Sequence, residues 1–265
     1  MADQPRQLTA PPHAAAHLLQ YHDLIESIVS ALDARDTYTA SHSNRVADMV
    51  LVLAAALGLD PDETALIHIA AHLHDIGKIA VPDAVLRKTG PLTADEWQEM
   101  RRHPVTGYNI LRRVADFQDI AVLVLHHHER WDGRGYPEGL RGDQIPLCAQ
   151  VVGLADAFDA LTSDRAYKAA YPYEKAVNMI LAGECGTFSP RLLECFKHVR
   201  GQFAELVRCP EDIVPGDLEL PAPEGTGQID TLQLLRNKYQ ALLHYTNATV
   251  VEVDFDQKLY HTVYN

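Results

Sequence analysis

Apolar side chains recur every three or four positions along most of this chain, a spacing that predicts a succession of amphipathic α-helices. Residues 14–34 carry one such apolar face. A second runs from Val46 to Gly58, and glycine commonly ends helices. Asp60-Pro61 opens the next helix with an N-cap residue followed by proline. The first third of the chain is therefore expected to be helical.

The same periodicity continues through the middle of the chain. A capping box at residues 93–96 opens a helix that runs toward His103, where Pro104 forces a break. Further helices are expected over residues 117–130 and from residue 145 to about 161, both strongly apolar on one face. These elements predict an all-α fold, a helical bundle.

Both ends of the chain depart from this pattern. Residues 1–12 are rich in proline and are expected to be flexible, whereas residues 13–208 form the helical domain. Residues 209–227, rich in proline, glycine and acidic side chains, are expected to be a linker. Residues 228–265 predict a helix and then a β-hairpin, an appendage of unknown role. The hairpin would dock on the helical domain, pair with another subunit or begin a further module.

Charge and composition narrow the class of protein. The 265 residues are 47% hydrophobic, which is enough for a sizeable core. With 36 acidic and 23 basic side chains, the net charge of −13 argues against a broad DNA- or RNA-binding surface. Four cysteines without CxxC spacing, no signal peptide and no membrane-spanning run favour a cytoplasmic protein that binds no membrane. Histidine is over-represented, with fourteen copies.

Several of these histidines sit where metal chemistry is plausible. His74-Asp75 ends an apolar helix and offers a nitrogen and an oxygen donor on adjacent residues, with Lys78 one turn later. A helix end with one buried histidine is the alternative. Asp156 lies within a strongly apolar helix, where an aspartate is costly unless it is paired or bound to a metal. Arg165 and Lys168 share one helix face and would clamp a phosphate or form an ordinary exposed pair.

Together these residues belong to a set of motifs that resembles the HD-GYP subgroup of the HD superfamily, over about residues 36–199. The motifs are His42-Ser-Asn-Arg-Val46, His74-Asp-Ile-Gly-Lys78, the helix ending at His103-Pro104, His127-His-Glu-Arg-Trp-Asp-Gly-Arg-Gly-Tyr-Pro137, Ala155-Asp-Ala-Phe-Asp-Ala-Leu-Thr-Ser163 and Asp164-Arg-Ala-Tyr-Lys168.

The resemblance implies a bacterial, cytoplasmic signalling enzyme. Its activity would be that of a metal-dependent phosphodiesterase that hydrolyses cyclic di-GMP to linear pGpG, GMP or both. Lys78 and Asp75 would be catalytic, with Asp75 bridging two metals, while Arg165, Lys168 and Tyr136 would bind substrate. The implied metal ligands are His42, His74, Asp75, His103, His127, His128 and Asp156.

Two metals per chain are expected, because Tyr38 stands where some family members carry a glutamate that recruits a third. Imidazole and carboxylate ligands without thiolates favour iron or manganese. A homodimer or signalling partner would bind through the C-terminal segment or the Gly135-Tyr-Pro137 loop. The alternatives are a di-iron oxygenase on the same scaffold and a cyclic dinucleotide sensor that does not cleave its ligand.

The remaining histidines are not expected to bind metal. His22 is predicted to lie on the surface. His68, His72 and His126 are predicted to be structural or solvated, because their positions around the helix axis differ from those of the matched ligands.

Overall fold

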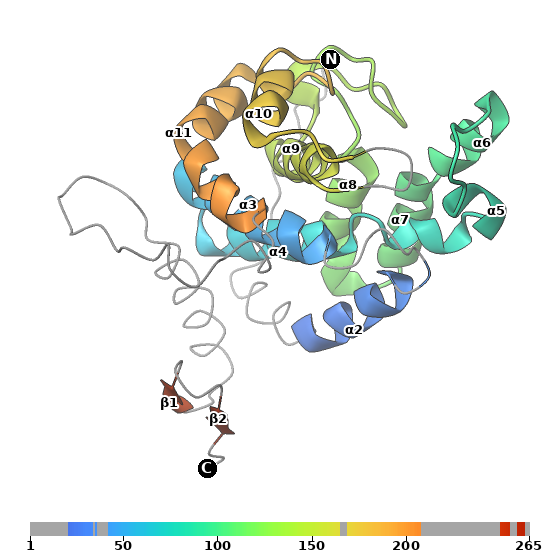
Figure 1. The fold of residues 1–265 in the computed structure, drawn as a ribbon. Helices are drawn as coiled ribbons and strands as arrows, with labels where there is room; N and C mark the ends of the chain where they lie inside the picture. The colour runs from blue at the N-terminus through green and yellow to red at the C-terminus, as the bar shows by residue number, and fades with distance from the viewer. Residues whose placement is uncertain are drawn as a thin grey trace, which may run out of the picture. The chain divides into compact units, whose positions relative to one another are not determined.

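A computed structural model of the chain describes residues 21–33, 35, 42–164, 169–207, 250–254 and 259–262. The chain divides into two compact units, residues 1–212 and 213–265. The described elements of the first unit are all helical (Figure 1), and the predicted all-α fold is confirmed. They are α2 (His22–Asp33), α3 (His42–Leu57), α4 (Pro61–Leu73), η1 (Ile76–Ala80), α5 (Asp83–Leu86), α6 (Ala94–Met100), α7 (His103–Leu111), η2 (Ala115–Phe117), α8 (Gln118–His126), η3 (Gly142–Gln144), α9 (Leu147–Thr162), α10 (Tyr173–Leu181) and α11 (Pro190–Val207).

Helix α9 is the centre of this unit. It contacts α3, α4, α8, α10 and α11, and Figure 1 shows these helices grouped around it. Phe158 of α9 lies against Phe196 and Phe203 of α11, with ring centroids 5.5 and 5.3 Å apart, and all three rings are fully buried. Large aromatic rings packed in this way contribute much of the apolar area that holds a helical core together.

The predicted helix boundaries rest on local capping chemistry. Glu63 N donates to Asp60 Oδ1 at 2.8 Å while Asp60 N donates to Glu63 Oε2 at 3.2 Å, so both halves of a capping box are present at the start of α4. The capping box at residues 93–96 is also formed. Gly58, after α3, adopts a φ of 69°, which is the left-handed conformation expected of a helix-ending glycine.

Three expectations about helices are corrected. The helix predicted over residues 117–130 ends at His126, so His127 and His128 lie in the turn that follows it. His22, predicted to be at the surface, is only 8% exposed, whereas Ile28, one of the apolar residues in the helix expected over residues 14–34, is 43% exposed. The buried face of α2 runs through Ile25 and Val29, and His22 lies one turn before Ile25 on that face.

The second unit contains an antiparallel strand pair, β1 (Val250–Asp254) and β2 (Leu259–Thr262), in which Asp254 lies opposite Leu259. Residues 255–258, which join the two strands, lie outside the described residues, and the hairpin appendage stays a prediction. The flexible start at residues 1–12, the linker at 209–227 and the helix at 229–245 lie outside the described residues. The domain boundaries therefore remain predictions.

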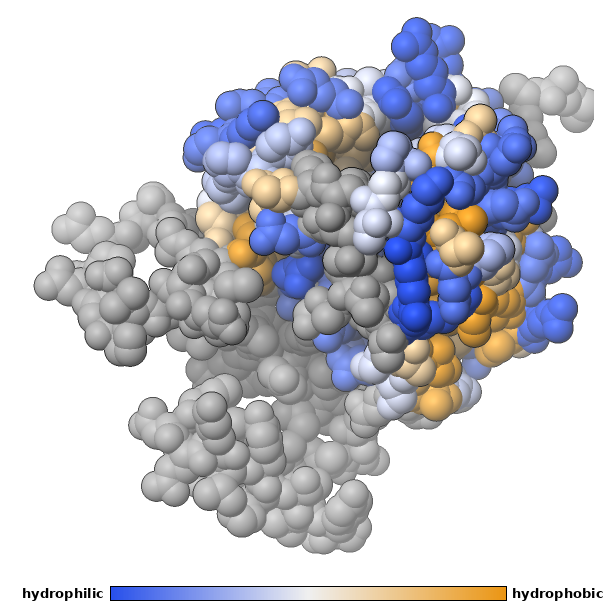
Figure 2. All heavy atoms as spheres, turned by 45° about the vertical axis from the view of Figure 1, so that its right-hand side comes forward, coloured by the Kyte–Doolittle hydropathy of each residue, from blue (hydrophilic) through white to orange (hydrophobic). Residues whose placement is uncertain are grey.

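The described surface of the helical unit carries both hydrophilic and apolar side chains. Figure 2 shows one face, on which hydrophilic side chains predominate and apolar ones gather in a smaller area. Among the described residues, no helix combines the length and apolar character needed to cross a membrane.

Candidate metal centre

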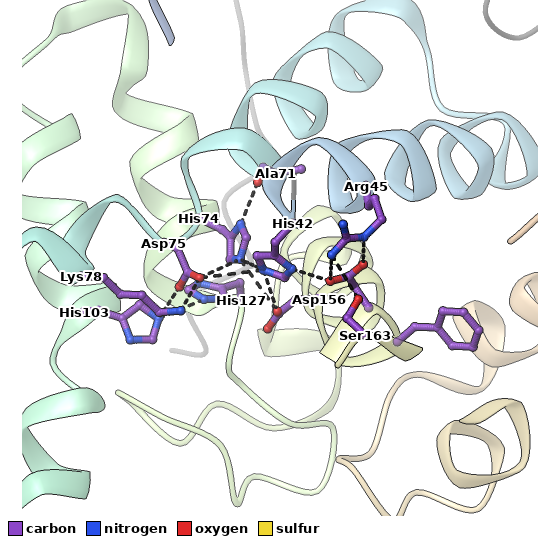
Figure 3. Close-up of polar contacts among 12 residues, drawn as sticks. His42, Arg45, Ala71, His74, Asp75, Lys78, His103, His127, Asp156 and Ser163 are labelled. Atoms are coloured by element: carbon purple, nitrogen blue, oxygen red, sulfur yellow. Dashed lines mark hydrogen bonds and ion pairs between the residues drawn. The ribbon is translucent and has the colours of Figure 1, made fainter. Parts of the chain in front are cut away.

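Helix ends deliver most of the predicted metal ligands to one place (Figure 3). His42 is the first residue of α3, His74 directly follows α4, and His103 is the first residue of α7. His127 and His128 follow α8, whereas Asp156 lies within α9. Seven residues from five separate segments of the chain are thus brought together. They are His42, His74, Asp75, His103, His127, His128 and Asp156.

Asp75 lies between two groups of histidines. Its Oδ2 is 3.3 Å from His74 Nε2 and 3.9 Å from His42 Nε2, whereas its Oδ1 is 3.3 Å from His103 Nε2. His103 Nε2 is in turn 3.3 Å from His127 Nε2. One carboxylate therefore presents one oxygen to each group, which is the geometry of a bridging ligand.

Asp156 completes the group around His42. Its Oδ1 lies 3.4 Å from His42 Nε2 and 3.8 Å from His74 Nε2, and those two imidazole nitrogens are 3.3 Å apart. An aspartate inside an apolar helix is costly without compensation. Here the compensation is the facing pair of imidazoles.

Backbone carbonyls orient three of the imidazoles. In each ring Nδ1 lies at hydrogen-bonding distance from a carbonyl oxygen three residues earlier, which places the proton on Nδ1. The lone pair of Nε2 is then left facing the cluster, as a metal ligand requires. The pairs are His74 with Ala71 at 2.7 Å, His103 with Met100 at 2.8 Å and His127 with Val124 at 2.7 Å.

His42 is oriented differently. Its Nδ1 lies 2.6 Å from Oδ2 of Asp159, a carboxylate only 1% exposed. Arg45 Nε donates to Asp159 Oδ1 at 2.5 Å, and its Nη2 donates to Ser163 Oγ at 3.1 Å. Asp159 lies in the quoted motif from Ala155 to Ser163 and was not among the predicted site residues. Its spacing of three residues from Asp156, on the same helix face, was the available signal.

The protonation states favour cation binding. Burial lowers the pKa of His103, lowers that of His127 well below its usual range and lowers that of His128 to about 3, so these imidazoles are neutral near pH 7. Burial alone would raise the pKa of Asp75. The charge of Lys78 and the contact with His74 outweigh burial and hold the pKa of Asp75 well below its usual range. Neutral imidazoles beside ionised carboxylates are the forms that divalent metals bind.

The spacing of the donor atoms also fits. Neighbouring ligands on one tetrahedral ion, with bonds of about 2.0–2.1 Å, are separated by roughly 3.3–3.4 Å. The closest nitrogen–nitrogen and nitrogen–oxygen separations in the cluster, 3.3 to 3.4 Å, match this value. The residues present therefore suit divalent cations.

His42 carries the main positive charge of the metal-free cluster. Burial by itself would lower the pKa of His42, but hydrogen bonds to Asp156 and Asp159 raise it to about 9. Nδ1 of His42 faces Asp159 and its Nε2 faces Asp156, 3.4 Å away. A cation bound at Nε2 would replace the proton on that nitrogen and offset the charge of Asp156.

Lys78 is held against the bridging carboxylate, with its Nζ 2.6 Å from Asp75 Oδ2. Lys78 and Asp75 therefore form an ion pair. Since the ammonium group also borders a cleft, the contact is compatible with a part in catalysis.

A cleft of about 940 Å³ opens onto the cluster. Tyr136 lines it, with its ring stacked 4.8 Å from His128 and the Arg101 guanidinium 4.4 Å from the ring centre. Burial raises the pKa of Tyr136, so its hydroxyl stays protonated. Arg130 and Arg134 also line the cleft, so its wall is locally basic although the chain is acidic overall.

The cleft arginines had no assigned role in the sequence analysis. Arg130 and Arg134 stand inside a quoted motif, but nothing in their spacing separated them from solvent-exposed arginines. Arg165, Lys168 and Tyr38 lie outside the described residues.

Glu129 fixes the loop that carries Tyr136. This carboxylate is 4% exposed and accepts hydrogen bonds from the backbone N–H groups of Glu138, Gly139 and Leu140, at 2.7, 3.0 and 3.0 Å. Hydrogen bonds to a charged group are stronger than neutral ones. Glu129 directly follows His127 and His128. Its hydrogen bonds therefore connect the wall of the cleft to the segment that carries two predicted metal ligands.

Two glycines allow the ligand-bearing segments to approach closely. A Cβ on Gly77 would overlap the carbonyl oxygen of His103, and one on Gly153 would overlap the carbonyl oxygen of His127. Only a residue without a side chain permits these contacts. The glycine of the His74–Lys78 motif is thus explained by the packing of η1 against α7.

Comparison with known proteins identifies the family. A family model described as HD domain matches residues 23–190. The chain belongs to the HD domain family. The family resemblance seen in the motifs is confirmed.

The HD domain chain also has curated relatives. It is 40% identical over 186 residues to the cyclic di-GMP phosphodiesterase response regulator RpfG of Xanthomonas campestris, covering 69% of this chain and 49% of the relative. It is 38% identical to the 3'3'-cGAMP-specific phosphodiesterase 2 of Vibrio cholerae, covering 65% and 33%. The chain thus spans between one third and about half of the length of these relatives.

Among solved structures, the HD domain chain is similar to a cyclic GMP-AMP-specific phosphodiesterase of Vibrio cholerae. The TM-score is 0.56 with 19% identity, over 84% of this chain and 59% of the other. At that identity the similarity shows the fold.

Proposed function

We propose that this chain is a metal-dependent phosphodiesterase that hydrolyses cyclic di-GMP to linear pGpG, GMP or both. The observation that carries the proposal is the position of Asp75, with one oxygen facing each of two histidine groups. The similarity to phosphodiesterases named for cyclic dinucleotides supports it.

The proposed centre holds two divalent ions bridged by Asp75. His42, His74 and Asp156 would complete one set of ligands, and His103, His127 and His128 the other. Imidazole and carboxylate donors favour iron or manganese. Two such ions supply a nucleophile at neutral pH and neutralise charge on the phosphoryl oxygens.

The chain's own groups would handle the substrate and the proton. Hydrolysis adds the oxygen of water to phosphorus and breaks the bond from phosphorus to a ribose 3′ oxygen, which leaves as an alkoxide. Lys78 Nζ, a donor beside Asp75, is positioned to protonate that alkoxide. Tyr136, which lines the cleft between His128 and Arg101, would contact the bound substrate there.

Phosphate contacts are assigned to Arg165 and Lys168, and the basic wall of the cleft supports binding of an anion there. Arg101, Arg130 and Arg134 place positive charge beside the cluster. This local charge would offset the long-range repulsion that a net charge of −13 exerts on a dinucleotide.

The deciding experiment measures product release from cyclic di-GMP and, separately, from 3'3'-cGAMP, with iron- or manganese-loaded protein. The expected result is turnover of cyclic di-GMP to pGpG or GMP. Binding without turnover would make the chain a sensor, and an oxygen-dependent product would make it an oxygenase. Either outcome would refute the proposal.

A matched pair of variants tests the ligand assignment. His127→Ala should remove metal and activity, whereas His126→Ala should keep both. His126 Nε2 lies 3.2 Å from Glu138 Oε2, so it is engaged away from the cluster. Metal loss in both variants, or in neither, would show that the ligands are wrongly assigned.

The setting of this activity is also proposed. We place it in the bacterial cytoplasm, as part of cyclic dinucleotide signalling. A homodimer or a signalling partner would bind through the C-terminal segment or through the loop that carries Tyr136.

A further inference from the structure

A second group of histidines lies between α2 and α4, apart from the cluster around Asp75. His22 comes from α2, whereas His68 and His72 are one turn apart on α4. All three are buried, with exposures of 8%, 4% and 2%. None of them lines the cleft.

The ring nitrogens of this group converge. His68 Nε2 is 3.4 Å from His22 Nε2 and 3.3 Å from His72 Nε2. One ligand atom from each of the three rings lies within 4.8 Å of the other two. The rings of His22 and His68 are parallel, while that of His72 is perpendicular to both.

Hydrogen bonds among the three nitrogens cannot account fully for this arrangement. An imidazole nitrogen offers either one N–H or one lone pair in the ring plane. His68 Nε2 faces two other Nε2 atoms and therefore cannot donate to one while it accepts from the other. A cation at their centre accepts all three lone pairs at once.

The nitrogen–nitrogen distances in this group match those between neighbouring ligands of one metal ion. Zinc–nitrogen bonds of about 2.0–2.1 Å at tetrahedral angles separate neighbouring ligands by roughly 3.3–3.4 Å. The two separations at His68 Nε2 equal this value. Histidines four residues apart on one helix are also a known arrangement for binding zinc.

Glu26 would supply a fourth donor once its half-exposed side chain turns toward the other two imidazoles. It lies one turn after His22 on α2, and its Oε1 is 3.7 Å from His22 Nε2. Each helix then contributes two donors four residues apart, His22 and Glu26 from α2, His68 and His72 from α4. Four donors on two facing helices suit the tetrahedral preference of zinc.

We propose that His22, His68 and His72, with Glu26, bind a zinc ion that holds α2 against α4. The site is structural, because its histidines are buried away from the cleft. It is separate from the Asp75 centre: His72 and His74 are two residues apart, which is a rotation of about 200° around a helix axis. The proposal does not depend on the phosphodiesterase activity.

Zinc titration of the purified full chain tests the site. To separate it from the other centre, the titration uses an Asp75→Ala background. We expect about one zinc per chain in Asp75→Ala, and none after His68→Gln and His72→Gln are added. His126→Gln, which replaces a buried histidine outside both clusters, is the matched control and should leave the zinc count unchanged. Equal zinc binding with and without the two α4 substitutions would overturn the proposal.

A second measurement uses Asp75→Ala protein in which His22, His68 and His72 are intact. Cobalt(II) added to Asp75→Ala should give the strong visible absorption of a tetrahedral ion, and zinc should displace it. Zinc should also raise the thermal midpoint of this protein, because an ion that binds only the folded state stabilises it. A weak octahedral spectrum with no zinc-dependent shift would show that the histidines are a hydrogen-bonded cluster.

Discussion

The ring of His42 is held by a buried carboxylate, whereas three other histidines of the centre are held by backbone carbonyls. Asp159→Ala removes this support together with the Arg45–Asp159 ion pair. Loss of a group that orients a ligand typically lowers metal affinity about 10–100-fold. Metal retained after dialysis against chelators of graded strength measures the change. Ser163→Ala, which removes only a contact to Arg45, is the control and should retain its metal.

Arg165 and Lys168 are predicted to bind phosphate and not metal. Each charge-assisted hydrogen bond is worth about 1.5–3 kcal/mol, so Arg165→Ala combined with Lys168→Ala should raise KM tenfold or more. Metal content should stay at its wild-type value. Steady-state kinetics at fixed metal loading and moderate salt provide the measurement. Unchanged kinetics would move phosphate binding to the arginines described in the cleft.

At the scale of helices and turns, close backbone contact at Gly77 sets the position of His103 relative to Asp75. Gly77→Ala would push η1 away from α7, since the added methyl group overlaps the His103 carbonyl. Overpacking of this kind typically costs about 1–3 kcal/mol. We therefore expect a lower thermal midpoint together with reduced metal content.

Gly90→Ala is the matched control for this change. Gly90 has open space around its Cα, so an added methyl group meets no neighbouring atom. Both the thermal midpoint and the metal content should be near wild type. Equal behaviour of the two variants would show that the contact at Gly77 is not needed to position the ligands.

The end of α3 and the starts of α4 and α6 were predictable from the sequence because local capping chemistry sets them, whereas the end of α8 was not. The Asp60–Glu63 capping box and the left-handed Gly58 are formed within a few residues of chain. The Asp159–His42 contact could not be found in this way, because it joins residues 117 positions apart. The convergence of His22 with His68 likewise depends on how α2 packs against α4. The motifs allowed the Asp75 centre to be predicted because they carry family information that a single helix pattern lacks.

At the scale of the whole molecule, the metal-free protein should lose stability in mild acid. Folding lowers the pKa of His103, His127 and His128, in the last case to about 3. An unfolded histidine titrates near pH 6.5, at roughly its model value. Below that pH the unfolded chain binds protons that the folded chain resists, so stability is full above about pH 6.5 and falls toward pH 3.

The contribution of His42 to the pH dependence of stability has the opposite sign. Because its pKa is raised to about 9, its contribution is complete below about pH 6.5 and is lost as pH rises through 9. Urea unfolding of chelator-treated protein at pH 5, 7 and 9.5 should therefore show the highest stability at pH 7. A flat profile between pH 5 and pH 7 would contradict the buried neutral state of the three histidines.

The glycine contacts and the carbonyl-anchored rings also bear on metal selectivity. Gly77 and Gly153 fix the segments that carry His103 and His127, and the carbonyls of Met100 and Val124 fix the two rings. The chain therefore sets the donor spacing before any ion arrives. Intrinsic affinity for divalent ions follows a general order along the transition series, so donor type and metal availability decide which ion such a framework takes up. The ion found in protein taken from cells should accordingly track the metal supply during growth.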